Sequence, residues 1–335
     1  MKEVAEAARV SIQTVSNFVN GRHGEMRAET RKRVEEAMRS LSYHPNSSAR
    51  GLRSTRTHAL AFLLLDEGAG FLADPMTDRI LAGAGDVVRG RHYGLLIQAG
   101  RPDGDADAVL SPLLERRADG ALLLLSGDPQ LRRRYVDRVL ELGVPCVVLE
   151  ETHAGSEAIS VVTANRSGAR RLADHLLASG HRRIAFIAAR VPWPMVEQRR
   201  LGYEDALRDA GIEPDPELAR FEGTWDARHG PVLARTLLAL PSPPTAIMCG
   251  NDLLALGVIQ GLRMHGVNVP GDVAVSGFND FDFAAYVDPP LTTVRTPGYE
   301  LGSIATERLI GAVEGAVPAG DVVTLPPTLV LRDSA

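Results

Sequence analysis

From residue 58 onward, short runs of apolar residues alternate with longer stretches in which apolar residues recur at helical spacing. The apolar runs are HALAFLLL, YGLLIQ, GALLLL, PCVVL, ISVVT, RIAFIA, TAIMC and DVAVSGF. The helical stretches lie near residues 76–90, 129–142, 165–179, 197–210 and 251–264. Because strands covered on both faces are apolar along their length, this alternation predicts parallel sheets covered by helices, an α/β architecture.

This α/β part is too long for one core of ordinary size, and its apolar runs fall into two groups separated around residues 150–160. We therefore expect two lobes with a cleft between them. In open parallel sheets, ligands bind beyond the carboxyl ends of the strands, so polar residues that follow a strand are candidate ligand contacts.

The first residues of the chain show a different pattern, one of short helices. Residues 2–8 have a small apolar face, and Ser11 is a suitable N-cap for a second helix whose inward positions are Val15, Phe18 and Val19. Two short helices joined by a tight turn are a helix-turn-helix candidate. A third helix, from about residue 28 to residue 41, would close the domain. Its apolar stripe consists of Val34, Ala37, Met38 and Leu41.

The outward face of the second helix carries hydroxyl, amide and apolar groups in place of the Glu and Lys mixture of a solvated helix. The predicted DNA contacts on and beside this face are Ser11, Ile12, Gln13, Thr14, Ser16, Asn17 and Asn20. Amides pair with adenine, an isoleucine meets a thymine methyl group, and hydroxyls suit phosphate oxygens, so the face fits a major groove. A generic helical bundle explains the apolar stripes equally well, but not this polar, uncharged face.

Charge is distributed unevenly along the chain, although the formal net charge is only −5. Residues 1–57 contain 11 Lys and Arg against 6 Asp and Glu, a net of +5, so residues 58–335 carry a net of −10. A small basic head on a larger acidic body is expected when one end of a protein contacts a polyanion.

Residues 46–57 are rich in Ser, Gly and Arg, which is typical of a flexible linker. The same segment can also form a short helix capped by Asn46, with Ala49 and Leu52 on one side. So short a helix is unstable alone and would order only on binding.

The segments EVAEAARVSIQTVSNFVNG, TRKRVEEAMRSLSYHPN and ARGLRS resemble the DNA-binding head of the lactose-repressor (LacI/GalR) family of bacterial transcriptional regulators. ASGHRRIAFIA, QRRLGYEDAL, PPTAIMCGNDLLALGV and PPLTTVRTP resemble that family's effector-binding core, which is similar to periplasmic sugar-binding proteins. The resemblance implies an N-terminal all-α helix-turn-helix head (residues 1–45), a hinge helix (46–57) and a two-lobed, periplasmic-binding-protein-like (type I) α/β core (58–335). It also implies a chain that crosses back, with lobe 1 about 58–158 and 287–317 and lobe 2 about 159–286 and 318–335.

In the hinge helix, the resemblance adds Ala49, Arg50 and Leu52 to the DNA contacts. Leu52 stands where the family inserts a leucine wedge into the minor groove, which unstacks a base step and bends the duplex.

Three features of the head depart from the family. Arg9 replaces a glycine in the turn, and Asn17 replaces an arginine near the end of the recognition helix. Met1 matches a position inside the family's first helix, so we expect the natural start to lie upstream.

For the effector site, the resemblance and the strand ends together indicate Asp74, Met76, Glu150, Trp193, Arg199, Trp225, Asn251, Asp252 and Asn279. Arg199 could instead be a surface arginine, Trp225 a buried structural residue, and Asp252 a helix cap. Asn279 and the pair Thr163 and Ala164 stand where the family favours aspartate, which removes two strong acceptors for sugar hydroxyls.

Composition and motifs exclude several classes of protein. An apolar content of 44% excludes a disordered chain, and two cysteines exclude a disulfide scaffold. We expect no transmembrane segment or signal peptide, hence a cytoplasmic protein, and no metal site, cofactor or enzymatic activity.

The sequence thus predicts a ligand-responsive transcriptional repressor of carbohydrate-metabolism genes, which binds operator DNA as a homodimer and a sugar or sugar derivative as effector. The alternative is a sugar- or nucleoside-binding protein whose helical head serves association rather than DNA binding.

Overall fold

The structure is a computed structural model that describes residues 1–19, 26–43, 56–68, 71–153, 155–190 and 193–335. The chain divides into two compact units, Met1–Thr57 and His58–Ala335, which are described separately. Every helix in the described part of the chain is too short or too polar to span a bilayer.

The first unit contains three helices, α1 (Lys2–Ala8), α2 (Ile12–Val19) and α3 (Ala28–Ser40). Small side chains from all three, such as Ala8, Val15 and Ala37, form its core. The backbone N–H of Thr14 donates to the hydroxyl of Ser11 over 3.1 Å, which confirms the predicted N-cap. Leu41 lies beyond the end of α3 and is 43% exposed, so its predicted place on the buried stripe is wrong.

The turn between α1 and α2 requires a left-handed residue, and Arg9 occupies it with φ 51° and ψ 52°. The N–H of Val10 donates to the carbonyl of Ala5 over 2.9 Å and closes the turn. Glycine adopts this conformation without steric cost, whereas a residue with a Cβ does not.

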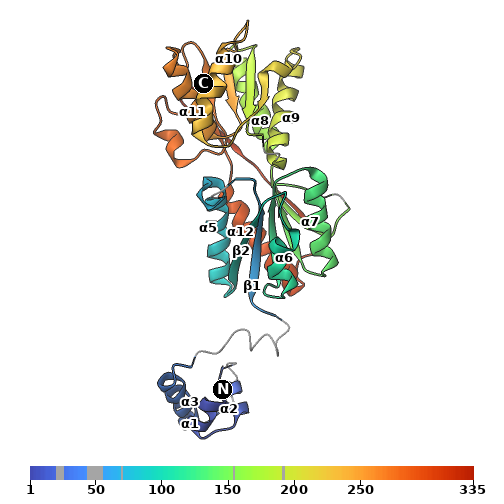
Figure 1. Cartoon of the computed structure of the whole chain (residues 1–335), viewed down its shortest axis with the longest axis vertical. Coiled ribbons are helices and arrows are strands. Elements are labelled where there is room, and N and C mark those ends of the chain that lie inside the picture. Colours follow the sequence, from blue (N-terminus) through green and yellow to red (C-terminus); the bar gives the residue numbers. More distant parts are fainter. Residues whose placement is uncertain (20–25, 44–55, 69–70, 154, 191–192) are drawn as a thin grey trace. The chain divides into compact units, whose positions relative to one another are not determined.

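The second unit begins with a six-stranded parallel sheet in the order β11-β5-β4-β3-β1-β2 (Figure 1). Its strands are β1 (Ala59–Leu65), β2 (Gly94–Gly100), β3 (Gly120–Leu125), β4 (Cys146–Leu149), β5 (Ile159–Thr163) and β11 (Val322–Leu325). Helices α5 (Pro75–Gly90) and α12 (Gly298–Glu314) pack on one face, and α6 (Ala106–Leu114) and α7 (Pro129–Glu141) on the other. Along β1, Phe62 and Leu64 face the first pair of helices, while Leu63 and Leu65 face the second. The uninterrupted apolar run of β1 therefore supplies two cores.

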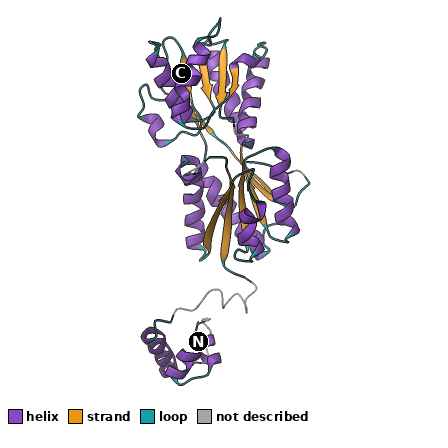
Figure 2. Ribbon diagram, viewed as in Figure 1, coloured by secondary structure: helices purple, strands orange, loops and turns teal. Residues whose placement is uncertain are grey.

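The second lobe repeats this arrangement of helices around a sheet (Figure 2). The sheet is parallel and has four strands in the order β7-β6-β8-β9. Its strands are β6 (Ile184–Ala188), β7 (Ala219–Phe221), β8 (Ala246–Cys249) and β9 (Ala274–Ser276). Helices α8 (Asn165–Ala178) and α9 (Pro194–Asp209) cover one face, and α10 (Gly230–Leu238) and α11 (Asp252–Met264) the other. Short 3₁₀ helices are η1 (Phe71–Ala73), η2 (Pro216–Leu218), η3 (Ala227–His229) and η4 (Asp282–Ala285).

The chain passes between the lobes more than once. Strands β10 (Thr293–Arg295) and β12 (Thr328–Val330) pair antiparallel, and between them the chain contributes α12 and β11 to the first lobe. In Figure 1 the orange-red α12 accordingly lies among the blue and green elements of that lobe.

The predicted boundaries of the lobes are wrong at three strands. Strand β10 was expected in lobe 1, but Leu291 and Val294 lie in the cores of the second lobe, so the chain returns to the first lobe only after β10. Residues 159–163 and 322–325 were expected in lobe 2, but β5 pairs with β4 and β11 pairs with β5, so both extend the first sheet. The chain leaves the first lobe only after Thr163. The predicted return to lobe 1 is confirmed for α12, which packs against α5.

Candidate functional site

The candidate nucleic-acid interface is the exposed side of α2. Ile12 is 50% exposed, and Gln13 lies beside it on the surface. The amide of Gln13 donates to Oδ1 of Asn17 over 3.0 Å, and the hydroxyls of Ser11 and Thr14 lie 2.9 Å apart. The face therefore presents amide and hydroxyl groups next to an apolar side chain, the mixture that base edges and thymine methyl groups require.

One predicted contact on this helix is wrong in its orientation. Ser16 is only 5% exposed and belongs to the buried side of α2. It lies about 60° around the helix axis from Val19, so the edge of the packed face covers it. Asn20, Ala49, Arg50 and Leu52 lie outside the described residues.

The candidate effector site is a cavity between the two lobes of the core, with about 640 Å³ of empty space including its opening to solvent. The first lobe lines it with Asp66, Asp74, Met76, Thr77, Ile80, Leu124 and Glu150. The second lobe lines it with Trp193, Met195, Val196, Arg199, Trp225, Asn251 and Asn279. The cavity thus brings together every predicted effector residue except Asp252, as expected from the ends of parallel strands.

Arg199, on α9, is the cation of the cavity and is only 4% exposed. Its Nε donates to Oδ1 of Asn165 over 2.9 Å, and its Nη1 donates to the carbonyl of Gly250 over 2.6 Å. Nη2 donates to Oδ1 of Asn279 over 3.1 Å, and the guanidinium lies 3.8 Å from the ring centre of Phe278. Burial lowers the pKa of Arg199 to about 10, which leaves it charged at neutral pH. The alternative of a surface arginine is therefore wrong.

Glu150 follows β4 and is 6% exposed. Its carboxylate accepts from the N–H of Thr163 over 2.9 Å, from the hydroxyl of Thr163 over 2.7 Å and from Nδ2 of Asn165 over 2.9 Å. Burial raises the pKa of Glu150 in spite of these hydrogen bonds. Asn165 thus contacts both charged groups, with its Nδ2 toward Glu150 and its Oδ1 toward Arg199.

Two aspartates add acceptors on the side of the first lobe. Asp74 is the N-cap of α5 and accepts from the N–H groups of Met76 and Thr77 over 2.8 and 3.1 Å. Burial raises the pKa of Asp74 and also that of Asp66, which follows β1. Asp66 was missed in the sequence, although its position directly after a buried parallel strand is the signal used for Glu150. Four other lining residues have no comparable signal in the sequence, because none of them is a polar residue directly after a predicted strand: Thr77, Ile80, Leu124 and Val196.

Both tryptophans of the chain line the cavity. Asn251 is the N-cap of α11 and donates from Nδ2 to the carbonyl of Trp225 over 3.1 Å, which fixes that segment. The indole N–H of Trp225 is buried and has no hydrogen-bond acceptor among the described residues. An acceptor on a bound molecule would satisfy it.

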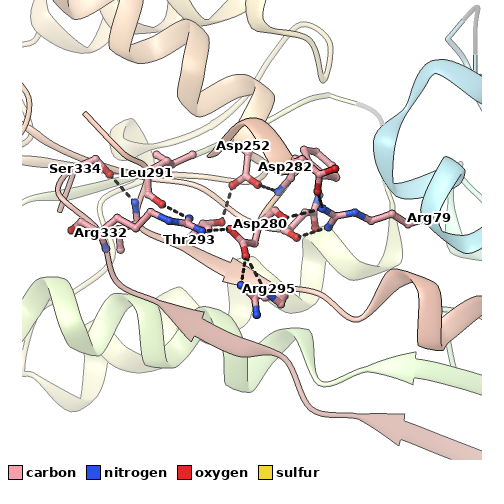
Figure 3. Close-up of polar contacts among 12 residues, drawn as sticks. Arg79, Asp252, Asp280, Asp282, Leu291, Thr293, Arg295, Arg332 and Ser334 are labelled. Atoms are coloured by element: carbon pink, nitrogen blue, oxygen red, sulfur yellow. Dashed lines mark hydrogen bonds and ion pairs between the residues drawn. The ribbon is translucent and has the colours of Figure 1, made fainter. Parts of the chain in front are cut away.

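Asp252 does not line the cavity. It is fully buried, and its carboxylate accepts from the N–H of Phe281 over 2.7 Å and from the hydroxyl of Thr293 over 2.6 Å (Figure 3). It therefore joins α11 to the turn after β9 and to β10. The helix cap proposed for Asp252 is made by Asn251, the residue before it.

Comparison with known protein families gives two matches. Residues 1–46 match the model for bacterial regulatory proteins of the lacI family, and residues 173–335 match a periplasmic binding protein-like domain. The chain is 30% identical to the ribose operon repressor of Haemophilus influenzae, over 100% of this chain and 98% of the relative. It is 31% identical to the HTH-type transcriptional repressor CytR of Escherichia coli, over 100% of this chain and 95% of the relative.

Solved structures show the same similarity over the whole length. The Lac repressor bound to ONPG in its repressed state matches with a TM-score of 0.87 and 28% identity, covering 99% of this chain and 98% of that chain. A complex of the transcriptional regulator CelR with cellobiose matches with a TM-score of 0.76 and 30% identity, covering 100% and 99%. These relatives are transcriptional regulators, and the similarity covers both the head and the core.

Proposed function

This chain belongs to the lacI family of bacterial regulatory proteins, and on that basis we propose that it represses transcription by binding operator DNA, with an affinity that a small molecule in the interlobe cavity changes. The helices of the head contact the operator, and the core senses the effector. We assign binding and no catalytic step to the cavity, and we place the activity in the cytoplasm, where bacterial DNA lies.

The head is the DNA-binding part. Ile12 and Gln13 are exposed on α2, where they can reach base edges in a major groove. Two heads of a homodimer would occupy two half-sites about one helical turn apart. The amide oxygen of Asn17 already accepts from the amide of Gln13, so this hydrogen bond orients the two side chains before they enter the groove.

The effector is a sugar or a sugar derivative. Trp193 and Trp225 offer flat apolar surfaces, on which the apolar faces of sugars pack well. Asp66, Asp74 and Glu150 offer acceptors for hydroxyl groups, and Arg199 offers donors. Asn279 presents an amide where the family favours a carboxylate, so this site has fewer charged acceptors than a usual member.

A single feature of the cavity carries the assignment of a ligand. Arg199 is buried, yet its described hydrogen bonds all go to neutral acceptors, namely two side-chain amides and one carbonyl. A buried guanidinium without a carboxylate in direct contact retains capacity for a further acceptor. Its rigid placement at the cavity wall suits a ligand oxygen.

A thermal-shift screen of the full chain against sugars and nucleosides tests the effector. A ligand at about 100 times its Kd stabilises the folded state by about 2.7 kcal/mol. The stabilisation should disappear in Arg199→Met and persist in Arg138→Met, which removes an exposed arginine on α7. If only nucleosides stabilise the protein, the effector is a nucleoside and not a sugar. If a ligand stabilises both variants equally, it binds outside this cavity.

A gel-shift titration with DNA from the promoter of its own gene tests the regulatory role. Binding should prefer that sequence and weaken steeply with salt, because each neutralised phosphate releases counterions. Binding that is absent, or that shows no preference for sequence, would favour a head that serves only association.

A further inference from the structure

Arg79 joins the two lobes of the core. It lies on α5 of the first lobe, and its guanidinium donates to three acceptors in residues 279–282 of the second lobe, where the turn after β9 leads into η4 (Figure 3). Nη1 donates to the carbonyl of Asn279 over 3.1 Å, and Nη2 donates to the carbonyl of Asp280 over 2.9 Å and to Oδ1 of Asp282 over 2.7 Å. A planar guanidinium is required to reach two adjacent carbonyls in this way.

The turn that Arg79 contacts is held in place by its own lobe. Asn279 and Asp280 both have left-handed backbones, with φ of 107° and 51°, which aim their carbonyls at Arg79. The carboxylate of Asp280 is 6% exposed, accepts a hydrogen bond from Nε of Arg295 over 2.8 Å and forms an ion pair with Arg332 over 2.7 Å. Because non-glycine residues adopt such backbones only when the surroundings enforce them, these two arginines stabilise an otherwise unfavourable turn.

The same turn belongs to the effector cavity. The side chain of Asn279 lines the cavity and accepts from Arg199, while the main-chain carbonyl of Asn279 accepts from Arg79. Oδ1 of Asn279 also accepts from the hydroxyl of Thr296 over 3.2 Å, so its side chain and its carbonyl are fixed together. One residue therefore contacts both the cavity and the link between the lobes.

We propose that Arg79 is a latch that holds the lobes closed on this side of the cavity, and that Asn279 transmits the state of the cavity to the latch. That the cavity receives an effector rests on the proposed function, whereas the latch itself does not. The two carbonyls carry most of the attraction, because they are held rigidly and the guanidinium makes both hydrogen bonds charge-assisted. The side chain of Asp282 is 99% exposed, so its ion pair with Arg79 adds little.

Tryptophan fluorescence of the full chain tests the latch without ligand or DNA, because both tryptophans line the cavity. Loss of charge-assisted hydrogen bonds in Arg79→Met should raise the ratio of open to closed molecules about tenfold. We expect a shift of the emission to longer wavelength and stronger quenching by acrylamide. Arg79→Lys, which cannot span both carbonyls, should be intermediate, and Asp282→Asn should resemble the parent.

Arg89→Met is the matched control, since Arg89 lies on the same helix and pairs only with Asp86 of that helix among the described residues. A circular-dichroism melt checks that each variant is folded at the working temperature. If Arg79→Met does not fold, the emission and quenching of Arg79→Lys, compared with those of the parent, test the latch instead. Emission and quenching equal to the parent in a folded Arg79 variant would overturn the latch. A failure of the parent to bind operator DNA would overturn the proposed function and leave this comparison valid.

Discussion

Replacement of Asp252 by asparagine should remove the part of the pH dependence of core stability that this buried carboxyl contributes below neutrality. Burial raises the pKa of Asp252 to about 7, from an ordinary value of 3.8, although Thr293 and Phe281 donate to it; Asp280 nearby adds to the rise and Arg199 opposes it. Asparagine has no charge to bury. Its Oδ1 can accept from the N–H of Phe281, and the hydroxyl of Thr293 can rotate to accept from its Nδ2.

The sign and size of the effect follow from proton linkage. Between pH 3.8 and about 7 the unfolded chain has released the proton of Asp252 while the folded protein still holds it. The contribution of Asp252 to the free energy of unfolding is therefore fully present below pH 3.8 and is lost as the pH rises through about 7. Each pH unit in this window is worth about 1.4 kcal/mol, so the difference between the parent and Asp252→Asn should change by about 2 kcal/mol from about pH 5 to about pH 7.

Urea unfolding of the full chain, followed by the fluorescence of its two tryptophans, measures this difference. Other titrating groups contribute to both proteins and largely cancel in the subtraction. Asp78→Asn, which changes an exposed carboxylate on α5, controls for the removal of one acidic group. A difference between the parent and Asp252→Asn that does not vary with pH would refute this account of the buried charge.

Two further predictions concern the head. Arg9→Gly should stabilise the head by about 0.5–1 kcal/mol. Glycine adopts the left-handed turn without the steric cost that a Cβ brings, and its larger loss of backbone entropy on folding offsets only part of this gain. Hydrogen exchange of the Val10 amide should slow a few-fold in this variant, and an unchanged rate would show that Arg9 is not strained. Gln13→Ala should weaken binding to the operator by about 1–3 kcal/mol without changing the salt dependence, since Gln13 is expected to contact a base. An equal loss on unrelated DNA in the gel-shift titration would contradict that role.

Local patterns in the sequence predict elements well when the element's own residues determine its environment. The run HALAFLLL predicts β1 because alternate residues pack against both helical layers, and the small apolar faces of α1 and α2 predict the head. The N-cap at Ser11 is equally local, since one hydroxyl and one N–H three residues later make it.

The predictions are wrong where a segment distant in the sequence determines the position of a strand or a side chain. The residues of β5 and β11 have apolar patterns that suit either sheet, and only their pairing with β4 places them in the first lobe. Asp252 follows a strand just as Glu150 does, but the left-handed turn at Asn279 and Asp280 brings the N–H of Phe281 to its carboxylate. Ser16 lies at the edge of a helical face, where the sequence spacing alone does not decide between burial and exposure.

The placement of Asn165 has a consequence for the electric field inside the cavity. Its amide lies between Glu150 and Arg199, donating 2.9 Å to one and accepting over 2.9 Å from the other, so the two charged groups are held in register without touching. When Glu150 is ionised, the opposite charges kept apart by the neutral amide form a fixed dipole, whose field is stronger where water is excluded. For the proposed sugar effector, this dipole would favour the stereoisomer whose hydroxyl group aligns with the field and disfavour the one whose hydroxyl group opposes it.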